Sequence, residues 1–549
     1  MALSFQLSPT VSTSSSSKFG PRVGQLTFKD ALTIPTPNIL APTSRGVVSH
    51  LSRDNLLRAN SITWIHVPFE SFLECKPPIL TLGSPAHDIL GFKRDKHIVS
   101  MSLRDLSDGR EMPPNTAKFV TAWCVRGVRK VTPEDWKEYV SKAQPDVVYA
   151  LVDSQPVTSQ KRLMKSVERT AEWLVHLLKP TTATTEPYRI PPILLQMPGN
   201  QSVPARSAFA RTLVEPLHPT EIDALKPLQL SCLDDSVIGY VVDGSVELMR
   251  ASLDLLNANK PRIAHTSSLA FEGLDQIRGP HDMLTLIRDV GIDMFGAEWA
   301  VKLAQWGVAL DFEFPAPAQA GSDAVSGPPP QARKDGKRDI GHNIYHVCYR
   351  TDFTPLINSQ STLQCHCIAC KPLSCETVIR HSVVDAEPEF PDSNASHTRA
   401  YIHHLLHTHE MSAHSLLVSH NVEVISMFLA GVRHVLSTPD QDFTKEVKRF
   451  FDYYNAGYAT SGEIQGVAEK VAEVVEAVVE ESKGLAGGFE VGVETGGTTP
   501  PVTAQVKSIG IGIALYDEAH ACWAEVERLR GKGSLKRERP SEREVSTEL

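Results

Sequence analysis

The sequence lacks an apolar run long enough to cross a lipid bilayer. A spanning helix needs about 20 consecutive apolar residues, whereas the longest apolar stretches here, such as residues 425–432, are much shorter. The first seventeen residues are rich in Ser and Thr, but they contain no Arg and no apolar signal-peptide core. The sequence therefore predicts neither a membrane span nor a targeting segment.

An excess of basic residues and a disulfide framework are also lacking. The 55 Lys and Arg residues are outnumbered by 64 Asp and Glu residues, so the formal net charge is −9. Binding of nucleic acid by charge alone requires clustered Lys and Arg, so any such contact has to use a local patch, for which 126–130 and 334–338 are candidates. The nine cysteines are thinly scattered apart from four between Cys365 and Cys375. That pattern indicates a reducing compartment and a local metal site.

Short apolar segments alternate with helix-like segments between residues 130 and 315, which is typical of parallel strands joined by helices. Ligand-binding groups in such folds follow the carboxyl ends of strands. We therefore expect Asp153, Gln196, Asp243 and the region of Gly296 to face one mouth. The expected strands are 146–152, 192–196, 237–242, 262–265, 292–295 and 308–312, and the expected helices are 166–178, 246–256 and 281–290.

Three stretches have a composition that cannot support a core, which predicts inserts or linkers at 315–338, 375–396 and 484–501. Between the last two, valines at helical spacing among glutamates predict an amphipathic helix at 464–479.

Three thiols lie within six residues, at Cys365, Cys367 and Cys370. Zinc prefers thiolate and imidazole ligands in a tetrahedron, so the fourth ligand has to come from elsewhere in the chain. Spacing alone does not choose among the downstream histidines, which are His397, His403, His404, His407, His409, His414 and His420. A reduced cysteine cluster without metal and an iron–sulfur cluster that uses Cys375 are the alternatives.

A catalytic zinc site of a hydrolase is a further alternative for the histidine-rich segment. Its ligands would come from His403, His404, His407, His409 and Glu410. The spacing departs from His-Glu-x-x-His, in which two ligands lie one helical turn apart around a general base.

Four blocks of sequence together resemble one family over about residues 20–455. They are 24–28 with 34–37 and 43–46; 352–356 with 365–370, 399–405 and 420–421; 291–295; and 166–170. They resemble the tRNA-guanine transglycosylases, which exchange a guanine in tRNA for queuine or a precursor. The resemblance implies a (β/α)8 TIM barrel with an inserted zinc-binding subdomain. It also selects His420 as the fourth ligand, so that one structural Zn²⁺ is held by Cys365, Cys367, Cys370 and His420.

The resemblance also divides the chain into five parts. We expect a flexible N-terminus (1–20), a barrel core (21–314), a disordered insert (315–340), a zinc-binding subdomain with the end of the barrel (341–455, with a low-complexity insert at 375–396), and a C-terminal extension that is partly helical and partly disordered (456–549).

The sequence departs from catalytic members of this family at the residues that perform the exchange. Where those members carry an Asp nucleophile, this chain has Gly296, which cannot form a glycosyl-enzyme bond. A second acid corresponds to Leu82, and Asp88 is a weak substitute. In the base pocket Asp153 remains, but Gln196 is followed by Met-Pro-Gly instead of Gly-Gly, and the proline removes an N–H donor.

These departures resemble the non-catalytic branch of the family. That resemblance implies a heterodimer with a catalytic subunit, formed through the zinc-bearing face, which exchanges guanine for queuine at the wobble position of tRNAs with GUN anticodons (those for Asp, Asn, His and Tyr). It also implies a cytoplasmic location, with peripheral association with the mitochondrial outer membrane in relatives. One alternative is an active transglycosylase with a relocated carboxylate from Asp293, Glu298 or Asp311. A zinc hydrolase on a barrel fold is the other.

Overall fold

The computed structural model describes thirteen segments of the chain, all within the first of two units, 1–510 and 511–549. Several sequence predictions lie outside these segments: Leu82, most of the inserts at 315–340 and 375–396, and the extension from residue 456, including the helix at 464–479. The described segments are 3–8, 18–29, 32–73, 84–106, 112–124, 126–154, 159–180, 190–258, 260–266, 279–317, 337–357, 364–371 and 396–455.

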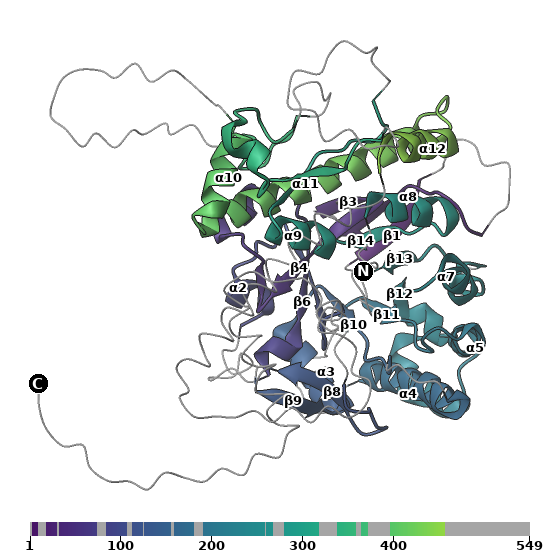
Figure 1. Ribbon diagram of the computed structural model, residues 1–549. Helices are drawn as coiled ribbons and strands as arrows, with labels where there is room; N and C mark the ends of the chain where they lie inside the picture. The colour runs from purple at the N-terminus through teal and green to yellow at the C-terminus, as the bar shows by residue number, and fades with distance from the viewer. Residues whose placement is uncertain are drawn as a thin grey trace, which may run out of the picture. The chain divides into compact units, whose positions relative to one another are not determined.

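Eight parallel strands form a closed barrel (Figure 1), because the last strand, β14, pairs with the first, β4. In order around the barrel they are β4 (Asn38–Ser44), β6 (Trp64–Pro68), β7 (Ile98–Ser102), β10 (Val147–Tyr149), β11 (Ile193–Gln196), β12 (Val237–Val241), β13 (Ile263–Thr266) and β14 (Met294–Gly296). This arrangement confirms the predicted (β/α)8 barrel.

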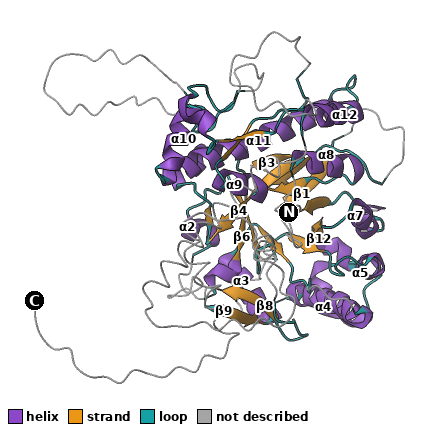
Figure 2. Ribbon diagram, viewed as in Figure 1, coloured by secondary structure: helices purple, strands orange, loops and turns teal. Residues whose placement is uncertain are grey.

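Helices in the connections between these strands surround the barrel (Figure 2). They are α1 (Arg53–Arg58), α2 (Ala86–Leu90), α3 (Pro133–Ala143), α4 (Gln160–Leu178), α5 (Val203–Val214), α6 (Pro219–Leu225), α7 (Val246–Leu253), α8 (Pro280–Asp289) and α9 (Glu298–Gln305). Alternate strand residues face opposite sides. In β6, Ile65 and Val67 therefore join the core beneath the helices, whereas Trp64 joins a separate core inside the barrel.

A three-stranded antiparallel sheet covers the amino ends of the barrel strands. It consists of β1 (Leu3–Leu7), β2 (Gly24–Phe28) and β3 (Leu32–Thr36). Leu26 and Ile34 of this sheet pack against the interior core of the barrel. The prediction of a flexible N-terminus is therefore wrong for Leu3–Leu7, because all five residues pair with β2 and Leu3 is buried.

The cysteine-bearing subdomain follows α9. Its elements are β15 (Val308–Leu310), β16 (Gly341–Asn343), the 3₁₀ helix η7 (Val347–Thr351), α10 (Arg399–His407), α11 (Met411–Ser437) and α12 (Phe443–Tyr453). The strand expected at 308–312 forms, but it pairs antiparallel with β16 and does not belong to the barrel. Helix α11 returns to pack against α9, β15 and β4, which places the subdomain within the last turn of the barrel.

The prediction of a disordered insert at 315–340 is wrong for residues 337–340. Ile340 is buried, and Arg338 forms an ion pair with Asp311 at the end of β15. Residues 337–340 therefore belong to the folded subdomain, because burial and an ion pair fix them in place.

Within the described segments, α11 is the one helix long and apolar enough to cross a membrane. Of its most apolar window, 61% is buried inside the protein. Core helices of globular proteins share this length and composition, so the hydropathy of α11 follows from its packing.

Candidate metal centre and barrel mouth

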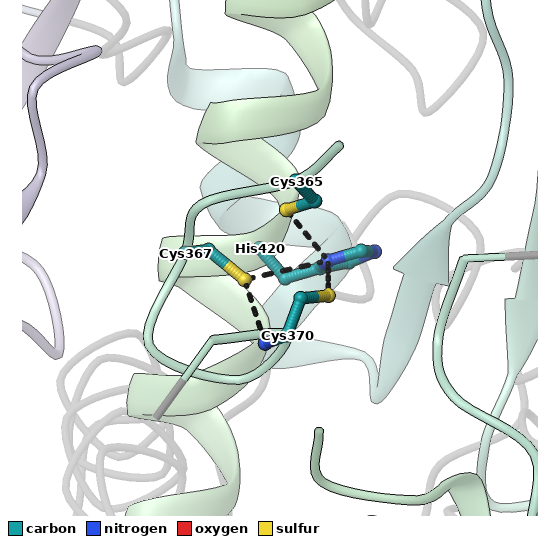
Figure 3. Close-up of side chains that lie close together, drawn as sticks. All are labelled: Cys365, Cys367, Cys370 and His420. Carbon is teal, nitrogen blue, oxygen red and sulfur yellow. Dashed lines mark hydrogen bonds between the residues drawn. The ribbon is translucent and has the colours of Figure 1, made fainter. Parts of the chain in front are cut away.

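Three thiols and one imidazole converge on a single point in the subdomain (Figure 3). Cys365, Cys367 and Cys370 come from one turn, and His420 projects from the middle of α11. The Nδ1 atom of His420 lies 3.8, 3.7 and 3.4 Å from the three sulfur atoms, in that order. A tetrahedral ion with bonds of about 2.3 Å to sulfur and 2.0 Å to nitrogen separates these atoms by about 3.5 Å. The cluster therefore fits a four-coordinate metal ion.

Neighbouring groups fix the orientation of the imidazole. The Nε2 atom of His420 donates to the carbonyl oxygen of Leu310 at 2.8 Å, so Nδ1 is left to face the sulfur atoms. A second-shell bond of this kind is usual for histidines that bind metals. Hydrogen bonds with Cys367 and Cys370 raise the pKa of the Cys365 thiol, and burial and repulsion from the neighbouring thiolates add to this effect.

Residues on either side of His420 attach the cysteine turn to the barrel. The hydroxyl of Ser419 accepts a hydrogen bond from the backbone N–H of Ile368. Asn421 accepts from the N–H of Leu310 and donates to the carbonyls of Ala300 and Val308. The metal cluster is thus connected through α11 to both α9 and β15.

The remaining histidines take other roles. His403 bonds to the carbonyl of Ile344 at 2.8 Å, and His407 bonds to that of Tyr345 at 3.1 Å. Within the described segments, Cys365, Cys367, Cys370 and His420 are the one group found that could hold a metal ion. All four ligand groups come from the protein, which leaves no open position for a hydrolytic water in a four-coordinate site. Cys375, which an iron–sulfur cluster would need, lies outside the described residues.

The predicted binding residues do lie at one mouth of the barrel. Gln196 and Gly296 end their strands, and Asp153 and Asp243 come just after β10 and β12. Parallel strands place these four positions at the same end of the barrel.

Two carboxylates at this mouth are already paired within the protein. Asp153 accepts hydrogen bonds from Arg169 and Asn115, both at 2.8 Å. Asp243 forms a buried ion pair with Arg206. Sequence reasoning missed both arginines, because nothing in their spacing along α4 and α5 marks them as partners of strand-end acids. Paired in this way, the carboxylates hold the strand ends to the helices.

The upper interior of the barrel is filled by polar side chains that bond to one another. His66 bonds to Ser100 at 3.0 Å and to Ser102 at 2.9 Å, and Tyr149 lies 3.3 Å from Nδ1 of His265. Burial lowers the pKa of each of these two histidines to about 3, so both are neutral at physiological pH. The groups are therefore engaged with each other within the core.

The three acids considered as relocated nucleophiles differ in their surroundings. Asp293 pairs with Arg22, and Asp311 contacts both Arg338 and His342. Glu298, in the first turn of α9, is 7% exposed, and its Oε2 atom has no hydrogen-bond partner in the described structure. Asp88 forms an exposed ion pair with Arg94, which makes it a surface residue.

Comparison with known proteins adds the family. A sequence profile of queuine tRNA-ribosyltransferase matches residues 17–456. A relative from Schizosaccharomyces pombe named queuine tRNA-ribosyltransferase accessory subunit 2 is 26% identical over 81% of this chain and 84% of its own length. Relatives of the same name from Trichoplax adhaerens and Danio rerio are each 24% identical, over 78% and 75% of this chain and 96% and 92% of their own lengths. With a closed parallel barrel, a Cys3His cluster and a profile match over most of its length, the chain belongs to the queuine tRNA-ribosyltransferase family.

Proposed function

We propose that this chain is the non-catalytic subunit of a heterodimeric queuine tRNA-ribosyltransferase. In this role it supports the exchange of guanine for queuine at the wobble position of tRNAs with GUN anticodons, and the catalytic subunit performs the chemistry. The observation that carries the proposal is Gly296 at the end of β14, where a covalent mechanism needs a nucleophilic side chain. The names of the relatives support the same assignment.

The surface of the subdomain supports pairing with another protein. The three most exposed large apolar side chains in the described structure are Met411, Phe353 and Val347, at 82%, 76% and 69% exposure. Tyr401 on α10 is also exposed, and α10 packs against both η7 and α11. Exposed apolar residues gathered on contacting elements mark a protein interface. We assign this face, defined by Val347, Phe353, Tyr401 and Met411, to the catalytic subunit and call it the apolar face.

Zinc is the ion that we propose for the Cys3His cluster. Three thiolates and one imidazole in a closed tetrahedron are the usual ligands of structural zinc. Bound zinc would fix the cysteine turn against α11 and thereby hold the neighbouring apolar face in shape. Cysteine and histidine ligands at this spacing make one zinc per chain the expected content.

The proposal is tested by measuring incorporation of labelled queuine into cognate tRNA. The assay is run with this chain alone, with the catalytic subunit alone, and with an equimolar mixture. We expect the chain alone to give no incorporation and the mixture to exceed either component. Incorporation by the chain alone would contradict the proposal and favour a relocated nucleophile. The cytoplasmic location stays a prediction, to be checked by fractionation.

A matched pair of variants tests the apolar face. Phe353→Asp places a charge on the proposed interface, whereas Ile222→Asp places one on α6, where an apolar side chain is 49% exposed. We expect the first variant to abolish co-elution with the catalytic subunit and the second to leave it unchanged. Equal behaviour of the two variants would place the interface elsewhere.

A further inference from the structure

The carboxyl group of Glu298 lies in the space that a side chain at position 296 would occupy. A Cβ atom built on Gly296 would overlap Oε2 of Glu298, and it would lie 2.7 Å from Cδ and 2.8 Å from Oε1. Contacts this short between a Cβ atom and other heavy atoms do not occur in ordinary packing. The carboxyl group of Glu298 can therefore lie in this place only because residue 296 has no side chain.

Glu298 reaches this place because of where α9 begins. The helix starts at Glu298, two residues after the end of β14, so the first-turn side chain can point back over the carboxyl end of the strand. The residue is buried, and the neighbouring groups that influence its charge are Asp105, Lys302 and Tyr149. Within the described structure no cation forms an ion pair with it. The Oε2 atom of this enclosed carboxyl group has no hydrogen-bond partner in the described structure. If the side chain turned away from Gly296, its charge or its volume would have to be placed among buried neighbours.

We propose that Glu298 closes the mouth of this barrel to a nucleoside. Its carboxyl group takes the volume that a nucleophile at position 296 would need and that a ribose would have to approach. The target nucleotide then enters only the barrel of the catalytic partner. This inference rests on the proposed function for its context, but it concerns a steric block that exists in the chain by itself.

A double-mutant cycle tests the block. The variants are Gly296→Ala, Glu298→Ala and the combination, made in the full chain and compared by thermal unfolding. Overpacking by one methyl group lowers the stability of a core by about 1–3 kcal/mol, which for a unit of this size is about 1–3 °C in the unfolding midpoint. We expect Gly296→Ala to show this loss in the wild-type background and to lose most of it when Glu298 is Ala. Equal losses in both backgrounds would overturn the proposal.

A matched control separates steric coupling from general destabilisation. Leu213 is fully buried on α5, and the helices that α5 mainly packs against are α4 and α7 and not α9. Leu213→Ala is expected to destabilise the chain by the same amount with Glu298 or with Ala at position 298, because distant sites are additive. If the loss caused by Leu213→Ala also depended on the residue at position 298, then Glu298→Ala would be altering the whole barrel. The result of the cycle with Gly296→Ala would then count against a local block.

The functional arm uses Gly296→Asp, alone and combined with Glu298→Gly, and follows covalent attachment of cognate tRNA on a denaturing gel. The single variant adds a nucleophile but keeps Glu298. We therefore expect either that this variant folds and forms no adduct, or that it fails to fold and only the combination with Glu298→Gly folds. An adduct with the single variant would overturn the proposal. So would an adduct with the wild-type chain that Glu298→Gln abolishes, since Glu298 would then be a nucleophile, and this result would also overturn the proposed non-catalytic role. If the mixture with the catalytic subunit exchanges guanine normally but the double-mutant cycle of Gly296→Ala and Glu298→Ala is additive, the steric block is overturned and the proposed function is not.

Discussion

Replacing Glu298 by Gln should make the protein more stable at alkaline pH without affecting it in acid. Burial raises the pKa of this carboxyl group to about 7 from its ordinary value of 4.5, and the negative charge of Asp105 adds to the effect while Lys302 opposes it. The folded state therefore holds a proton that the unfolded state releases near pH 4.5. Stability from this group is complete below pH 4.5 and is lost as the pH rises to about 7. Gln has the same shape but carries no charge at any pH, so it escapes this loss.

The size of the effect follows from the difference between the two pKa values. A rise from 4.5 to about 7 corresponds to roughly 3 kcal/mol, at about 1.4 kcal/mol per unit. Unfolding entropy scales with chain length, so for the family domain of residues 17–456 this free energy moves the unfolding midpoint by about 3 °C. The buried His66 and His265 have pKa values of about 3 and do not titrate in this window.

The assay is thermal unfolding of the wild-type chain and Glu298→Gln in matched buffers from pH 4.5 to 8. We expect the two midpoints to coincide at the acid end and to diverge steadily, with the variant about 3 °C higher at pH 8. All other titrating groups are shared and cancel in the difference. A difference that stays constant across this range would refute the reasoning, because the carboxyl group would then be solvated or paired in the folded state.

Three further predictions concern the subdomain. Cys367→Ser should reduce bound zinc from one per chain to near zero by elemental analysis, and should lower the unfolding midpoint by about 5 °C or more, since metal binding contributes directly to folding. Asn421→Ala removes three buried hydrogen bonds and should lower the unfolding free energy by about 3 kcal/mol in urea titrations while the zinc content stays at one. Met411→Asp should weaken binding to the catalytic subunit at least tenfold by calorimetry, whereas Leu228→Asp, at another exposed apolar position in the segment between α6 and β12, should not.

The strands that the sequence predicted are those with uninterrupted apolar runs. Strands β10 to β14 were all expected within a few residues of their observed bounds, because β-branched and aliphatic residues fill both faces. Strands β4, β6 and β7 were not recognised. Their inward positions include His66, Ser100 and Ser102, and His66 bonds to both serines inside the barrel. In the sequence these polar residues interrupt the apolar runs that predict buried strands, because their partners are distant along the chain.

The metal cluster could be predicted in part. The three cysteines follow from spacing, since one turn can direct all of them at a single ion. His420 lies fifty residues beyond Cys370, and the resemblance selected it where spacing could not. The structure accounts for the choice, because the bond of His420 to Leu310 and the bonds of Asn421 to β15 and α9 hold α11 in a rotation that presents residue 420 to the thiols. Contacts of this kind depend on packing between elements that are distant in sequence.

The contacts at the barrel mouth support the proposal that this chain acts through its surface and not through its interior. An enzyme keeps carboxyl groups at the strand ends poised for a ligand, at some cost in stability. Here Asp153 and Asp243 are paired with arginines, and the space at Gly296 is filled by Glu298. Each change replaces a binding group with an internal contact, whereas the apolar face beside the metal cluster keeps exposed side chains that a globular core would otherwise bury. We therefore expect Gly296→Asp alone to give no covalent adduct, because Glu298 would still occupy the space that the substrate of a catalytic barrel would need.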